Sequence, residues 1–176
     1  MSELEDFRRE KDQFFRTHQT SPLTPSQKRS FQGLHYYPEN SALRFHLPLD
    51  ANIAHDTIVM ETSTGDTQSY TRAGKITFAV DGQDATLFVY ASDDNPHQFF
   101  LPFRDATSGK ETYGAGRYLE TELEDDGTVL VDFNLAYNPY CAYNEQWSCP
   151  IPPVENWLKA PITAGEMAFE EVGAGH

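Results

Sequence analysis

Most of the side chains that could do chemistry lie in one stretch of the chain, residues 132–166. This stretch holds both cysteines, Cys141 and Cys149, among tyrosines, asparagines and prolines, and it follows neither a helical nor a strand period. An ordered segment of this kind must satisfy many backbone and side-chain polar groups at defined positions. We therefore predict a long ordered loop near the C-terminus.

The two cysteines are the nucleophilic and redox-capable groups of this loop. Cys141 is the candidate nucleophile or redox thiol, because a thiolate attacks carbon and sulfur centres. Seven residues separate it from Cys149, so a disulfide forms only if the loop folds back on itself. Two reduced, buried thiols are the simpler expectation. The histidines form no metal-binding pattern, so no metal site is predicted, and the sequence leaves the cofactor unknown.

A second polar stretch, residues 102–119, precedes the loop and contains two arginines. If Leu123 pairs with Thr128 across the turn between them, Arg117 lies opposite Asn134 and close to Asp132 on one face. A shift of one residue in this register removes the grouping. The alternative is that these polar groups form a structural network that holds the loop.

The candidate ligand-binding residues combine these groups with the tyrosines and amides of the loop. They are Arg104, Asp105, Tyr113, Arg117, Asp132, Asn134, Tyr137, Asn138, Cys141 and Tyr143. Two further carboxylates, Glu155 and Glu166, are expected to be exposed.

Three functions remain open on this evidence. The first is binding of a small polar or anionic ligand in a pocket lined by Arg, Asp, Asn and Tyr. The second is an enzyme, a hydrolase or a thiol redox enzyme, with Asp105 or Asp132 as base, an arginine that stabilises an anion, and Cys141 as nucleophile. The third is a structural or interaction module without a small-molecule site, whose loop closes a barrel or covers a sheet edge.

The elements that must position these residues begin with two helices. Ser2 and Glu5 form a capping-box pattern, and the following residues predict an amphipathic helix to about residue 18 with Phe7 and Phe14 on its apolar side. Thr24 is placed to cap a second, short helix that starts at Pro25.

From residue 43 onward the pattern predicts an antiparallel β domain. Short segments rich in β-branched and aromatic residues alternate with turn sequences, and no βαβ rhythm occurs. About eight strands are expected, which favours a mainly β fold, either an antiparallel barrel or a sandwich. They cover 43–49, 57–62, 68–72, 75–80, 85–91, 98–103, 116–123 and 128–134. The predicted division is a helical brace at 1–32, one β domain at 33–169 and a flexible tail at 170–176.

Composition limits the classes of partner. The 176 residues carry a formal net charge of −14, which repels phosphate backbones and anionic lipid. No apolar run approaches the ~20 residues of a membrane helix. We expect a cytoplasmic protein that binds neither nucleic acid nor membrane, with an oligomeric state that composition does not define.

Three blocks of sequence resemble a bacterial and archaeal family known only as a domain of unknown function. They read G-L-H-Y-Y-P at 33–38, P-F-R-D-A-T-S-G-K-E-T-Y-G-A-G-R-Y-L at 102–119, and D-F-N-L-A-Y-N-P-Y-C-A-Y-N at 132–144, which continues through C-P-I-P-P-V-E-N to A-G-E at 164–166. The resemblance implies that the ten candidate residues belong to a family pattern, together with Thr107, Cys149, Glu155, Asn156 and Glu166. It assigns no reaction to them.

Overall fold

The computed structural model describes residues 3–92 and 95–169, which form a mainly β protein with helices at the N-terminus. The helices are α1 (Glu3–Thr17) and α2 (Pro25–Ser30). The strands are β1 (Arg44–Pro48), β2 (Thr57–Glu61), β3 (Thr67–Val80), β4 (Gln83–Ser92), β5 (Asn95–Phe103), β6 (Arg117–Glu122) and β7 (Thr128–Asp132). Four short 3₁₀ helices complete the fold: η1 (Ser41–Leu43), η2 (Phe133–Leu135), η3 (Tyr140–Ala142) and η4 (Val154–Asn156).

The strands form two antiparallel sheets that face each other like a sandwich rather than closing into a barrel. One has the order β2-β3-β4-β5-β6, and the other pairs β1 with β7. Isolated bridges between Leu123 and Val129 and between Asp50 and Lys75 connect the sheets at two points. The predicted antiparallel β fold is confirmed, and it is the sandwich-like alternative that occurs.

Two of the predicted strands are one continuous strand, β3, which has a bulge between Arg72 and Gly74. The bulge lies where the chain beyond β1 approaches β3. A Cβ on Gly74 would stand 2.7 Å from Cδ1 of Leu49, so a side chain at this position would push the two segments apart.

The main core lies between the two sheets. Alternate residues of β3 and β4, including Ile76, Phe78, Leu87 and Val89, point inward and are buried, whereas Thr77 is exposed. This is the predicted period-two pattern of a sheet with one buried face. The tyrosines of the polar loop are not part of this core and pack in two smaller clusters.

The predicted pairing of the segment after Gly116 with the segment after Gly127 is wrong. Leu123 bridges Val129 instead of Thr128, a shift of one residue. Beyond this turn β6 does not continue as a ladder with β7, and its start is bridged instead to the segment after η2, through Tyr118 and Tyr137. Arg117 consequently lies opposite Phe103 in the sheet, not opposite Asn134.

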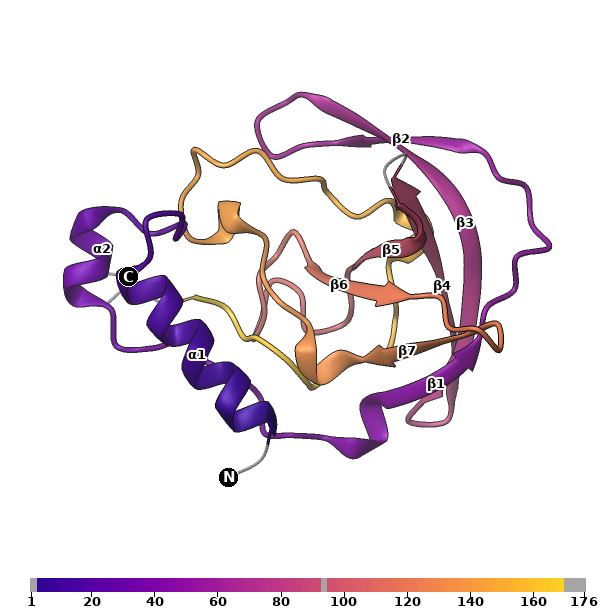
Figure 1. Ribbon diagram of the computed structural model, residues 1–176, viewed down its shortest axis with the longest axis horizontal. Helices are drawn as coiled ribbons and strands as arrows, with labels where there is room; N and C mark the ends of the chain where they lie inside the picture. Colours follow the sequence, from indigo (N-terminus) through magenta and orange to yellow (C-terminus); the bar gives the residue numbers. More distant parts are fainter. Residues whose placement is uncertain (1–2, 93–94, 170–176) are drawn as a thin grey trace.

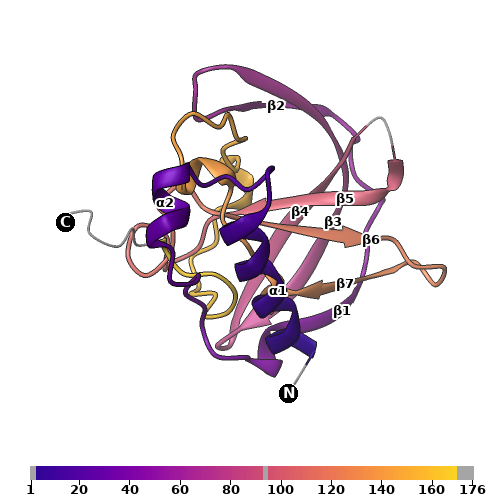
Figure 2. The same ribbon diagram turned by 60° about the vertical axis from the view of Figure 1, so that its left-hand side comes forward.

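The helices pack on one side of the molecule, next to the loop that follows β7 (Figures 1 and 2). The capping box of α2 is present, since the Thr24 side chain accepts from the backbone N–H of Gln27 while the Gln27 side chain accepts from that of Thr24. Phe15 of α1, Phe31 and Tyr143 of the loop share a small apolar cluster. The proposed cap at Ser2 and the predicted tail at 170–176 lie outside the described residues.

Candidate functional site

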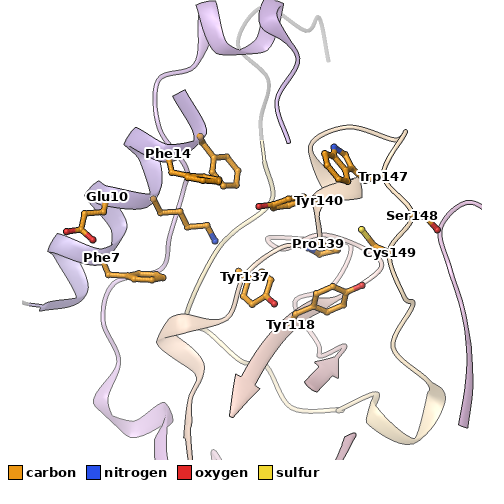
Figure 3. Close-up of a pocket in the computed structure, with 12 residues that line it drawn as sticks. Phe7, Glu10, Phe14, Tyr118, Tyr137, Pro139, Tyr140, Trp147, Ser148 and Cys149 are labelled. Atoms are coloured by element: carbon orange, nitrogen blue, oxygen red, sulfur yellow. The ribbon is translucent and has the colours of Figure 1, made fainter. Parts of the chain in front are cut away.

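A pocket of about 690 Å³ lies between α1 and the loop that follows η2. Its walls are mostly aromatic (Figure 3). The lining residues are Phe7, Glu10, Lys11, Phe14, Phe15, Tyr118, Tyr137, Pro139, Tyr140, Trp147, Ser148 and Cys149. A volume of this size is in the range of small-molecule sites, roughly 300–1,000 Å³.

Helix α1 supplies one wall through residues spaced three and four apart. Phe7, Glu10, Lys11 and Phe14 occur at i, i+3, i+4 and i+7, a spacing that places them along one face of a helix. Phe7 keeps 45% of its surface exposed, although it belongs to the apolar face. A large apolar side chain left open at the mouth of a pocket is available for a ligand.

Lys11 connects this wall to the body of the protein. Its ammonium forms an ion pair with Glu166 and lies 5.1 Å from the ring centroid of Tyr137 and 5.6 Å from that of Phe15. The ammonium thus lies near two aromatic rings while Glu166 neutralises its charge.

Glu166 is buried, with only 1% of its surface exposed, which corrects the expectation of an exposed carboxylate. It accepts hydrogen bonds from the backbone N–H of Asn138, at 2.9 Å, and from the hydroxyl of Tyr143. Burial and the neighbouring Glu166 charge raise the pKa of Tyr143 well above its ordinary value. The carboxylate is therefore an internal anchor that holds α1 and the loop together.

The opposite wall comes from η3 and the segment after it. The rings of Tyr140 and Trp147 meet edge to face with their centroids 5.1 Å apart. The end of this segment is fixed to the β2–β3 turn, because the Ser63 hydroxyl donates to the Trp147 carbonyl at 3.0 Å and accepts from the Cys149 N–H at 3.1 Å. The loop is ordered by many such backbone contacts, as the sequence predicted.

The two cysteines meet behind the pocket as free thiols. The backbone N–H of Cys141 donates to Sγ of Cys149 at 3.4 Å, and the Tyr113 hydroxyl lies 3.6 Å from Sγ of Cys141. A hydrogen bond from Cys149 is the main cause that lowers the pKa of the Cys141 thiol to about 6. Hydrogen bonding to Cys141, together with burial, raises the pKa of Cys149.

Arg117 and Asp105, two predicted site residues, form a fully buried pair away from the pocket lining. Their closest charged atoms are 3.5 Å apart, and no part of the Arg117 side chain is exposed. Arg117 also donates to the carbonyls of Ile162, Ala164 and Glu166. Burial lowers the pKa of the Arg117 guanidinium, and the Asp105 charge opposes this effect. The pair fastens the C-terminal segment to the sheet.

Asp132 and Asn134 remain close to each other, but Arg117 does not join them. The Asp132 carboxylate accepts from the Asn134 side chain at 2.9 Å and from Arg44 at 3.1 Å. Asn134 in turn bonds both backbone groups of Asn40. This network links β7 to the segment before β1.

The remaining candidates divide between support and lining. Arg104 stacks on the indole of Trp157, 4.4 Å from the ring centroid, and the Asn138 side chain donates to the Met167 carbonyl. Of the ten predicted ligand-binding residues, Tyr137 is the one that belongs to the pocket lining. Asp105, Asp132 and Cys141 share no hydrogen bond within the described chain, so neither candidate base of the enzyme hypothesis is hydrogen-bonded to the thiol.

The pocket residues that sequence reasoning missed are Lys11, Tyr118, Tyr140 and Trp147. The apolar face of α1 was visible in the sequence, and a lysine one turn after Phe7 was the available signal for the ion pair. Nothing local marked Tyr118, because its place in the pocket depends on its backbone bridge to Tyr137.

One group of possible metal ligands occurs in the part of the chain that the structure describes. His46, Glu124 and Asp126 place ligand atoms within 4.8 Å of one another, all on exposed side chains. His46 and Glu124 already pair at 2.8 Å, so the group is explained without an ion. Among the described residues no helix is long and apolar enough to span a membrane.

Comparison with known proteins agrees with this architecture. The model of a family described as a protein of unknown function, DUF1684, matches residues 29–167. The solution NMR structure of an uncharacterized protein from Haloarcula marismortui is similar, with a TM-score of 0.71 and 37% sequence identity over 93% of this chain and 91% of that chain. No curated protein gives a match. The chain therefore belongs to the DUF1684 family of proteins of unknown function.

Proposed function

We propose that the protein binds a small, uncharged, ring-containing molecule in the aromatic pocket. The observation that carries the proposal is the pocket itself, about 690 Å³ in volume and walled by rings from α1, β6 and the loop. Aromatic walls favour flat apolar ligands, because ring pairs add to the free energy gained from burial alone. This ligand class replaces the polar or anionic ligand that the arginines suggested.

The charges around the pocket support an uncharged ligand. Lys11 is neutralised by Glu166, and the net charge of −14 disfavours anions. A cation would meet the ammonium of Lys11 next to the ring faces it needs. Arg117, which the anion hypothesis requires, is fully buried against carbonyl groups.

Two polar groups of the loop are free to orient such a ligand. The hydroxyl of Tyr140 and the indole N–H of Trp147 have no hydrogen-bond partner among the described residues, and both residues line the pocket. A ligand with one acceptor on a ring would satisfy either group while its rings pack against the walls.

The test is a ligand-observed NMR screen of matched neutral, anionic and cationic aromatic fragments. We expect hits among the neutral compounds and a loss of affinity of about tenfold, or about 1.4 kcal/mol, in Trp147→Ala. Trp157→Ala is the matched control, because Trp157 is similarly exposed but lies at Arg104 and outside this pocket. Equal losses in both variants, or binding confined to anionic fragments, would contradict the proposal.

We also propose a cytoplasmic location and no nucleic-acid or membrane partner, on the basis of the strong acidity of the chain and its thiol pair. A cysteine pair of this kind stays reduced in the cytosol. Alkylation of intact cells followed by mass spectrometry of the protein tests this, and two blocked cysteines are the expected result.

A further inference from the structure

The chain between Cys141 and Cys149 folds back and brings the two thiols together at one side of the pocket. Cys141 lies in η3, and Cys149 lines the pocket next to Trp147. The 3.4 Å contact between the Cys141 backbone nitrogen and Sγ of Cys149 places the second sulfur beside the residue that carries the first. Both side chains pack with Tyr118 in one small cluster.

The environment gives the two thiols different pKa values. Hydrogen bonds from Cys149 and Tyr113 lower the pKa of the Cys141 thiol to about 6, although burial alone would raise it. The same interaction and burial raise the pKa of Cys149. Cys141 is thus the more acidic of two thiols that lie side by side, which is the arrangement of an attacking and a resolving cysteine.

We propose that Cys141 and Cys149 are a redox-active dithiol pair, in which Cys141 attacks a small hydroperoxide and Cys149 resolves the product to an intramolecular disulfide. This inference is independent of the ligand proposed above. Exposures of 7% for Cys141 and 9% for Cys149 restrict direct access to an oxidant of about the size of hydrogen peroxide.

The chemistry is balanced by the two thiols and one peroxide. The Cys141 thiolate attacks one peroxide oxygen, the O–O bond breaks, a sulfenic acid forms and hydroxide leaves. The Cys149 sulfur then attacks the Cys141 sulfur, the S–O bond breaks, and the departing oxygen takes the Cys149 proton to leave as water. In total two thiols lose two hydrogen atoms and one peroxide becomes two waters. An external dithiol reverses the change by supplying two hydrogen atoms.

The disulfide would connect η3 to the segment of Trp147, and both carry side chains of the pocket wall. The shape of the pocket would therefore differ between the reduced and oxidised protein. A disulfide across the seven residues between Cys141 and Cys149 also restricts this part of the chain in the unfolded state.

The test treats the reduced full chain with one equivalent of hydrogen peroxide at pH 7. Residues 118–159 contain both cysteines and their only lysine or arginine is the last residue, so one tryptic peptide reports the reaction. We expect this peptide to lose two hydrogen atoms while the protein stays monomeric in mass. Protein unfolded in urea is the comparison, and we expect it to react at least about tenfold more slowly, because its thiols have ordinary pKa values near 8.5.

Single variants identify the attacking sulfur. In Cys149→Ser, which removes the resolving sulfur but keeps a hydrogen-bond donor beside Cys141, dimedone should trap a sulfenic acid at Cys141, whereas Cys141→Ala should be labelled at least about tenfold more slowly. Labelling of Cys149 in Cys141→Ala as fast as labelling of Cys141 in the Cys149 variant would overturn the assignment. Equal rates in native and unfolded wild type, or disulfides only between chains, would overturn the pair even if both variants failed to fold.

Discussion

The acidity of the Cys141 thiol is increased by hydrogen bonds rather than by a neighbouring cation. Hydrogen bonds from Cys149 and Tyr113 to its sulfur outweigh the effect of burial on its pKa. Hydrogen bonds to the charged form lower a pKa in the same way as an opposite charge does. The reactivity of this residue therefore depends on the folded loop.

Alkylation by iodoacetamide should follow this pKa. The lowered pKa means that the thiolate is present above about pH 6 and is lost as the pH falls below it, so the rate should rise with a midpoint near pH 6. Cys149→Ala removes the largest cause, and its midpoint should move upward, toward the ordinary value of about 8.5. Identical midpoints in the two proteins would show that Cys149 does not set the reactivity of Cys141.

Arg117 has a structural task that the sequence could not distinguish from binding. Replacing it with methionine leaves Asp105 buried without its partner and frees three carbonyl groups. We expect Arg117→Met to lower the free energy of unfolding in urea by about 3–5 kcal/mol. Arg104→Met, which removes a stacking contact with Trp157, should cost about 1 kcal/mol or less. Similar costs in the two variants would contradict the role of Arg117 as the anchor of the C-terminal segment.

At the scale of elements, α1 is both a brace and a wall of the pocket. Its docking rests on Phe15 in the apolar cluster and on the ion pair of Lys11 with Glu166. The family match begins at residue 29 and so does not include this helix. The wall supplied by α1 is thus the part of the pocket that the family model leaves undefined.

The ion pair between Lys11 and Glu166 should contribute to the stability with which α1 is docked. Lys11→Met leaves Glu166 buried without its cation, and we expect a loss of about 1.5–3 kcal/mol in stability with faster amide exchange throughout α1. Lys28→Met is the control, because the Lys28 ammonium reaches only the exposed carbonyl of His18. Unchanged exchange in α1 after the Lys11 substitution would mean that the apolar cluster alone docks the helix.

The capping box of α2 gives a second prediction at this scale. Thr24→Ala removes the acceptor for the Gln27 N–H, at 3.2 Å, and should cost about 1 kcal/mol. Thr24→Ser keeps the acceptor and should cost much less. Thermal unfolding of the two variants checks the difference, and equal melting temperatures would count against the cap.

For the whole molecule, the dominant feature is the excess of negative charge. A formal net charge of −14 destabilises the compact state through repulsion among its carboxylates. Salt screens this repulsion, since the Debye length falls from about 10 Å at 0.1 M to about 3 Å at 1 M. We expect the melting temperature to rise as the NaCl concentration increases from about 0.05 M to about 1 M, because the shorter Debye length weakens the repulsion among the carboxylates.

A charge-reversal variant separates screening from general salting-out. Glu122→Lys places a cation among Glu120, Glu124 and Asp125 in an acidic surface groove. It should raise the melting temperature at low salt and reduce its dependence on NaCl. A salt dependence identical to that of the wild type would assign the stabilisation to salting-out.

Local sequence determined the elements of this protein, because their signals depend on neighbouring residues. The amphipathic face of α1, the capping box at Thr24 and the alternation along β3 and β4 were all readable. The order of the loop was also predictable, since its many polar groups require defined partners. Turn sequences located the reversal between β6 and β7, although not the partners of these strands.

Only the tertiary structure decided which side chains share a site. A shift of one residue at Leu123 and Val129, and the separate partners of β6 and β7, took Arg117 away from Asn134. Such pairings depend on ladders between distant segments, which local patterns do not specify. The docking of α1 likewise brought Lys11 to Glu166 across most of the chain and created the pocket. The sequence alone therefore determined the elements and the order of the loop, whereas long-range packing determined the site.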